Sequence, residues 1–99
     1  MSDEFFALPP FKPAEALVQL KRSLRDLRAL TERADGFELK GSAVIALALG
    51  DGAIDARLAR RPTRGAPEWD RYALAGSPDI RKFTDEVRRR LARWTEEER

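Results

Sequence analysis

The spacing of apolar residues changes twice along this chain of 99 residues, and this change most limits the folds open to it. Near both ends, large apolar residues recur every three or four positions, which is typical of one face of an amphipathic helix. Between these segments, apolar residues alternate with small or polar ones, which is typical of half-buried strands. The sequence therefore predicts a single domain with a helix near each end and a sheet between them.

The first helix is expected over residues 13–34. Pro13 suits the first helical position, where the N–H that proline lacks has no partner in the helix. Asp35-Gly36 would end the helix, because glycine tolerates the left-handed conformation of a C-terminal cap. Five leucines lie on one face of this helix: Leu17, Leu20, Leu24, Leu27 and Leu30.

Residues 37–61 are expected to form a hairpin. Gly50-Asp51-Gly52 predicts a tight turn, and the return strand would run from Ala53 to Arg61. Gly41-Ser42 interrupts the first arm of the hairpin, so that this arm is either one bent strand or two strands.

A third strand is expected over residues 68–75, after a loop at 62–67. Its phase has two alternatives: either Tyr72 and Leu74 point inward while Trp69 and Ala73 point outward, or the reverse. Trp69, at the start of this strand, suits either the core or the edge of an interface.

A second helix is expected from Ser77 to about Thr95. Ser77-Pro78-Asp79 supplies an N-cap residue, a proline in the first turn and an acid near the positive end of the helix dipole. The apolar stripe of this helix comprises Ile80, Phe83, Val87, Leu91 and Trp94.

The resulting order, α-β-β-β-α, predicts a two-layer α+β domain over residues 13–95. It would have an antiparallel three-stranded sheet with two amphipathic helices on one face. An irregular apolar N-terminal arm would precede it at residues 1–12, and an acidic tail would follow at residues 96–99.

Composition excludes several kinds of chemistry. The chain has no Cys and no His, which removes disulfides, cysteine-based zinc sites and histidine-dependent catalysis. A site of carboxylates for a hard cation is the metal site that composition leaves open. Five residues could meet on one side of the sheet, but no catalytic motif orders them: Asp51, Asp55, Arg57, Asp70 and Tyr72. We therefore expect no enzymatic activity, cofactor, metal or small-molecule substrate.

No stretch approaches the roughly 20 apolar residues of a membrane span. The first residues contain Asp3 and Glu4, where a signal peptide needs basic residues. These features predict a cytoplasmic protein without a membrane partner.

The net charge of +2 combines acidic ends with a basic middle. Between Phe5 and Thr95 there are 18 basic and 12 acidic residues, a net charge of +6, and Arg supplies 15 of the 19 basic residues of the chain. Arginine arrays bind phosphate groups, so the sequence predicts contact with nucleic acid or another polyanion. The expected contact residues are Arg57, Arg61, Arg64, Lys82, Arg89 and Arg93.

The abundance of basic residues is also compatible with two origins unrelated to binding. Codon bias in a GC-rich genome would enrich Arg together with Ala, of which the chain has 15. On the second helix, acids three or four positions before basic residues would also form ordinary surface ion pairs, such as Asp85 with Arg89 and Glu86 with Arg90.

The sheet face turned away from the helices is expected to be rich in alanine, which suits close contact with a second sheet. The N-terminal arm, with three phenylalanines, would either pack across its own core or dock on a second subunit or partner. The expected interface residues are Phe5, Phe6, Phe11, Val44, Ala46, Ala48 and Trp69. The sequence thus predicts a small non-catalytic binding domain, with a homodimeric protein–protein interaction module as the alternative.

Overall fold

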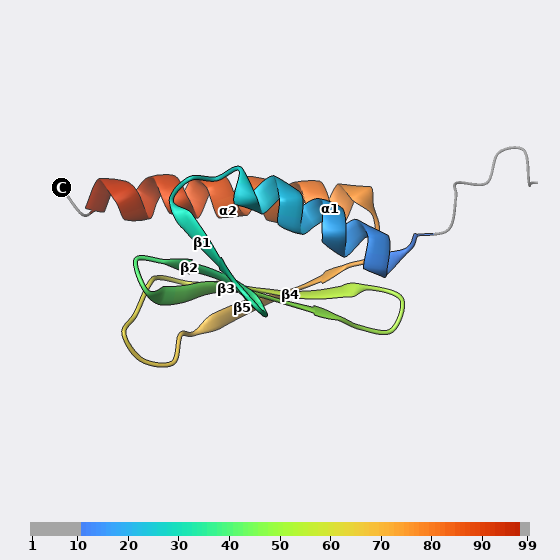
Figure 1. The fold of residues 1–99 in the computed structure, drawn as a ribbon, viewed down its shortest axis with the longest axis horizontal. Helices are drawn as coiled ribbons and strands as arrows, with labels where there is room; N and C mark the ends of the chain where they lie inside the picture. The colour runs from blue at the N-terminus through green and yellow to red at the C-terminus, as the bar shows by residue number, and fades with distance from the viewer. Residues whose placement is uncertain (1–10, 98–99) are drawn as a thin grey trace, which may run out of the picture.

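The structure, a computed structural model, describes residues 11–97. Two helices pack on one face of a five-stranded antiparallel sheet (Figure 1), and the strands follow one another across the sheet in chain order. The strands are β1 (Leu30–Arg33), β2 (Gly36–Leu39), β3 (Ser42–Leu49), β4 (Ile54–Ala59) and β5 (Trp69–Leu74). The helices are α1 (Pro13–Arg25) and α2 (Ser77–Glu97).

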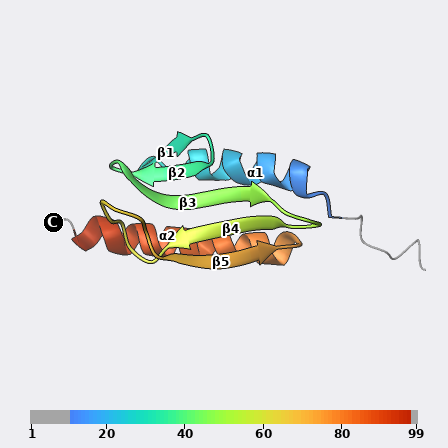
Figure 2. The ribbon, with the colours of Figure 1, turned by 90° about the horizontal axis from the view of Figure 1, so that it is seen from below.

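The two helices lie side by side and leave the other face of the sheet open. Figure 2 shows that face toward the viewer, with α1 behind the β1–β3 half and α2 behind β4 and β5. In agreement, α1 contacts β1, β3 and β4, and α2 contacts β5. The two-layer α+β architecture expected from the sequence is confirmed, with both helices on one face.

The core lies between the helices and the sheet. Leu20 and Leu24 are the buried residues of α1, and Phe83 and Val87 are fully buried on α2. Trp94 is also buried, as its position in the apolar stripe predicts. Phe83 meets the ring of Tyr72 edge to face, at 5.2 Å between ring centroids, and this contact joins α2 to β5.

The expectation of a three-stranded sheet is wrong for two reasons: α1 ends at Arg25 instead of near residue 34, which frees residues for β1, and the first arm of the expected hairpin forms two strands, β2 and β3. The chain turns after Arg25: the amide of Leu27 donates to Leu24 O, and the amide of Leu30 donates to Leu27 O. Leu30 then enters β1 and pairs with Leu39 of β2. Leu30 is buried in the core, and Leu27 is partly buried against it.

Two glycine turns shape the rest of the sheet. Lys40 and Gly41 have φ angles of 50° and 87°, the conformation of the two-residue hairpin turn that matches the twist of its strands. This turn separates β2 from β3, so the two-strand alternative for the first arm holds. Gly52, with a φ of 74°, lies in the turn between β3 and β4, where the sequence predicted it.

The strand at β5 and the helix at α2 agree with the sequence prediction within two residues. At the start of α2, the carboxylate of Asp79 accepts a hydrogen bond from the amide of Ala75 at 3.0 Å. Neither helix described in residues 11–97 is long and apolar enough to cross a membrane.

Candidate functional site

The sheet face that neither helix covers carries the residues with most potential for binding. The β4–β5 register pairs Leu58 with Asp70 and Ala56 with Tyr72 on the helix side. Alternation therefore turns Trp69 and Ala73 outward, which selects the first of the two phases expected for this strand. We call this surface the outer face; it comprises Ala43, Ala46, Ala48, Asp55, Arg57, Ala59, Trp69, Arg71 and Ala73.

Trp69 is the large apolar residue of the outer face. It is partly buried, packs against the core cluster and lies directly opposite Ala59, which has no exposed surface. An alanine can be fully covered on an open sheet face only if a neighbouring side chain lies over it. The indole of Trp69 is placed to do so.

The expectation that Val44 is an exposed interface residue is wrong, because Val44 is fully buried. Phe37 pairs with Ile45 and Glu38 with Ala43, which leaves Val44 as an additional residue in β3 at a bulge. The bulge interrupts the alternation of β3 at this point, and Val44 belongs to the core cluster. Ala46 is partly exposed and Ala48 exposed, and both belong to the outer face.

Two arginines lie beside Trp69 on the outer face. Arg57 pairs directly with Arg71 across β4 and β5, and Arg71 is two residues after Trp69 on the same side of β5. Arg57 is 3.7 Å from Asp55, whereas Arg71 is exposed and has no ion-pair partner among residues 11–97. Like charges directly opposite each other destabilise a sheet, so this arrangement favours an anion placed between them.

A hollow of about 330 Å³ opens on the outer face beside Trp69. Small residues from two strands line it, among them Gly36, Ala43 and Ala46. Asp35 and Glu38 also line it, and Arg33 donates a hydrogen bond of 3.1 Å to Glu38. The lining of the hollow thus combines small and apolar residues with two carboxylates and one guanidinium group.

The loop 60–68, between β4 and β5, adds basic residues near the outer face. Figure 1 shows this loop below the sheet, on the side away from the helices. Arg60 is held by Asp70 at 3.0 Å and Glu68 at 3.4 Å. Arg61 and Arg64 are exposed and have no ion pair within the described part of the chain.

The structure divides the six expected polyanion contacts between two sides of the molecule. Arg57, Arg61 and Arg64 belong to the outer face or its loop. The helix α2 packs on the face of the sheet opposite to the outer face. The other three expected contacts are exposed on this helix: Lys82, Arg89 and Arg93. Sequence reasoning missed Arg71, because only the register between β4 and β5 puts it opposite Arg57.

Ion pairs on α2 follow helical spacing, and the expected pair of Glu86 with Arg90 is present, whereas Asp85 has a different partner from the one expected. Glu86 lies 3.7 Å from Arg89 and 2.8 Å from Arg90, and Asp85 pairs with Arg88 rather than with Arg89.

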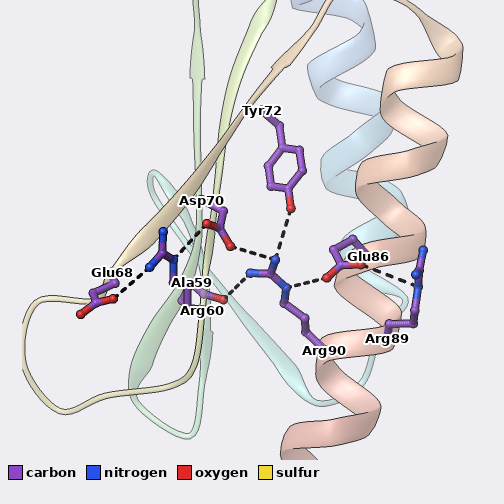
Figure 3. A network of polar contacts seen from close by, with 8 residues as sticks. All are labelled: Ala59, Arg60, Glu68, Asp70, Tyr72, Glu86, Arg89 and Arg90. Atoms are coloured by element: carbon purple, nitrogen blue, oxygen red, sulfur yellow. Dashed lines mark hydrogen bonds and ion pairs between the residues drawn. The ribbon is translucent and has the colours of Figure 1, made fainter.

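Arg90 is the centre of a polar network on the helix side of the sheet (Figure 3). Its guanidinium donates to the Ala59 carbonyl at 3.0 Å and to the Tyr72 hydroxyl at 3.3 Å. It also pairs with Asp70 at 2.9 Å and with Glu86 at 2.8 Å. With its side chain only 13% exposed, Arg90 ties α2 to both β4 and β5.

The five residues considered for catalysis do not come together. Asp51 lies in the β3–β4 turn, Asp55 and Arg57 lie on the outer face, and Asp70 and Tyr72 lie on the other side of the sheet. Hydrogen bonds from Arg60 and then Arg90 lower the pKa of Asp70, whereas burial raises the pKa of Tyr72. Asp70 and Tyr72 both contact the guanidinium group of Arg90 and belong to its polar network.

A larger groove lies elsewhere, between α1 and the start of α2. Its volume is about 1200 Å³, and Phe11, Val18, Leu20 and Ile80 give it an apolar lining. Phe11, an expected interface residue, therefore packs at this groove, while Phe5 and Phe6 lie outside the described residues.

Comparison with protein-family models, curated proteins and solved structures finds no significant match. Within residues 11–97, no group of three or more metal-ligating side chains is close enough to hold a metal ion.

Proposed function

We propose that this chain is a small non-catalytic domain that binds nucleic acid through the outer face. The observation that carries the proposal is the direct pairing of Arg57 with Arg71, beside Trp69, on a sheet face that no described helix covers. Phosphates and bases together offer what these side chains bind: anionic oxygens for the guanidinium groups and flat rings for the indole.

The arginine pair supports a phosphate ligand on electrostatic grounds. Arg57 and Arg71 are paired in the register of β4 and β5, and like charges at paired positions repel. The carboxylate of Asp55 is 3.7 Å from Arg57. A phosphate between the two arginines would accept hydrogen bonds from both and remove that repulsion. Arg61 and Arg64, without ion pairs among the described residues, would extend the contact to neighbouring phosphates.

The test is binding to labelled single-stranded and duplex DNA and RNA, measured by fluorescence anisotropy at several salt concentrations. We expect affinity to fall steeply with salt, because bound phosphates release counterions. The double variant Arg57→Gln, Arg71→Gln should reduce the salt slope on single strands by about 1.4, since each lost contact contributes about 0.7.

A matched control removes two charges from the other side of the molecule. The double variant Lys82→Gln, Arg93→Gln has the same net charge as the sheet variant, and it should bind nearly as the wild type does. A loss confined to this helix variant would assign the interface to α2. No binding tighter than about 100 μM at low salt, the weak end of non-specific affinity, would rule the proposal out.

The second candidate is a homodimeric protein–protein interaction module. The observation that favours it is the set of exposed alanines on the outer face, Ala43, Ala48 and Ala73, which would permit close approach of a second sheet. In such a dimer Arg71, which has no ion pair among residues 11–97, would lose water without gaining a counterion, and this makes the dimer the weaker candidate.

A further inference from the structure

We propose, on the basis of the function just proposed, that the hollow beside Trp69 seats one unpaired nucleobase. The domain would then select single-stranded nucleic acid whose bases carry an amino group. Three features support this: the shape of the hollow, the side chain beside it and the distribution of charge around it.

The shape fits a small flat ring. The volume of about 330 Å³ is at the lower end of small-ligand sites, which span roughly 300–1,000 Å³. Ala43 and Ala46 leave the space that larger side chains would fill. Trp69 forms one side, and an indole is a sequence-tolerant stacking partner because every base has a π-face.

The charges separate a base from a phosphate. Asp35, Glu38 and Arg33 line the hollow, and Arg33 is bound to Glu38 at 3.1 Å. This leaves a net negative charge that would repel a phosphate, whereas Arg57 and Arg71 lie beside Trp69 along the same face. A nucleotide would therefore bind with its base in the hollow and its phosphate at the arginines. Carboxylates accept hydrogen bonds from the amino groups of cytosine and adenine, which thymine and uracil lack.

A duplex cannot use this hollow without losing the stacking and pairing of the base that enters it. Single strands present their bases without that penalty. Duplex binding would then be limited to the phosphate contacts, and the preference for single strands would depend on Trp69 and the hollow.

The experiment uses the full chain and oligo(dC), oligo(dT) and duplex DNA of about 12 nucleotides, within the usual site size of such domains. We expect oligo(dC) to bind about tenfold more tightly than oligo(dT) or duplex, and Trp69→Ala to remove about tenfold, the typical effect of one stacked base. Trp69→Phe should retain most of the affinity. Because Trp94 is buried, quenching of intrinsic fluorescence by oligo(dC) would report on Trp69.

Ala43→Leu supplies a variant that leaves the core intact, because Ala43 is exposed and lines the hollow. It should abolish the preference for oligo(dC) while duplex binding stays unchanged. If Trp69→Ala and Ala43→Leu both bind oligo(dC) as the wild type does, no base binds in the hollow, although phosphate binding by Arg57 and Arg71 is not contradicted. Base binding in the hollow is also contradicted if inorganic polyphosphate of equal charge displaces labelled oligo(dC) as well as unlabelled oligo(dC) does. If no nucleic acid binds at all, the proposed function fails first.

Discussion

At the scale of single residues, Arg90 makes polar contacts with four different groups. Its side chain serves two carboxylates, a backbone carbonyl and a phenol, and it is mostly shielded from water. Charged hydrogen bonds in such a position contribute more than exposed ion pairs do. The residue is therefore expected to contribute to stability although it lies outside the apolar core.

We expect Arg90→Met to lower the free energy of unfolding by about 2–3 kcal/mol, because it leaves the Ala59 carbonyl and the Asp70 carboxylate without this partner. Urea unfolding followed by circular dichroism measures this. Arg89→Met is the control: Arg89 shares Glu86 as a partner but is well exposed, so its loss should be below about 0.5 kcal/mol. Equal losses in the two variants would contradict a special role for Arg90.

Gly36 allows β2 to approach β3 closely. A Cβ at this position would lie 1.8 Å from the carbonyl oxygen of Ile45. Gly36→Ala should therefore destabilise the fold by about 2–3 kcal/mol, the range of severe overpacking, as measured by thermal melting. Gly65→Ala, which meets no atom within 4 Å, should leave the melting temperature nearly unchanged. If Gly36→Ala leaves the melting temperature unchanged, the pairing between β2 and β3 shifts readily to accommodate the Cβ.

At the scale of secondary-structure elements, Asp70 links β5 to α2 and makes that link dependent on pH. Hydrogen bonds from Arg60 and Arg90 hold the pKa of its carboxyl below the ordinary value. A group whose pKa falls on folding stabilises the fold when ionised. This contribution is complete above the unfolded value of about 3.9 and is lost as pH falls through the folded value.

We therefore expect Asp70→Asn to be less stable than the wild type by about 1–2 kcal/mol at neutral pH, and the difference to shrink as pH falls below about 4. Urea unfolding at both pH values measures it, with Asp51→Asn in the β3–β4 turn as the control. A difference that stays constant with pH would exclude the charge of Asp70 as its cause.

The elements predicted correctly from the sequence are those whose local signals indicate a single type of structure. Ser77-Pro78-Asp79 could only begin a helix, and Gly50-Asp51-Gly52 could only turn a hairpin, and both predictions are correct. The end of α1 was missed, because Leu27 and Leu30 keep helical spacing and residues 26–34 contain neither Gly nor Pro. Pairing of Leu30 with Leu39 overrides that local preference, and such tertiary effects leave little trace in local spacing.

At the scale of the whole molecule, the candidate site depends on the register between strands. Alternation predicted the outward direction of Ala46, Ala48 and Arg57, but the position of Arg71 opposite Arg57 depends on how the loop 60–68 aligns β4 with β5. A loop of this length permits several registers, so the pairing of the two arginines could not be derived from local patterns. The bulge that buries Val44 was missed because it is a property of the pairing between β2 and β3, which the alternation of β3 alone does not show.

The oligomeric state tests the choice between the two candidate functions. If the outer face binds nucleic acid, the protein should sediment as a monomer of about 11.2 kDa at micromolar concentration. Sedimentation velocity with and without oligonucleotide makes the comparison. A tight dimer that dissociates in Ala48→Glu would favour the interaction module, whereas a dimer unaffected by this substitution would form through another surface.

The strand order also has a consequence for how the chain folds. Each strand pairs with the next one along the chain, so no pairing requires distant segments to meet first. Proteins dominated by such local contacts fold quickly, because little loop entropy is lost before contacts form. Formation of the turns should then limit the folding rate. Gly41→Ala places a side chain at a φ of 87°, and we expect it to slow refolding more than Ile80→Ala or Trp94→Ala near the two ends of α2.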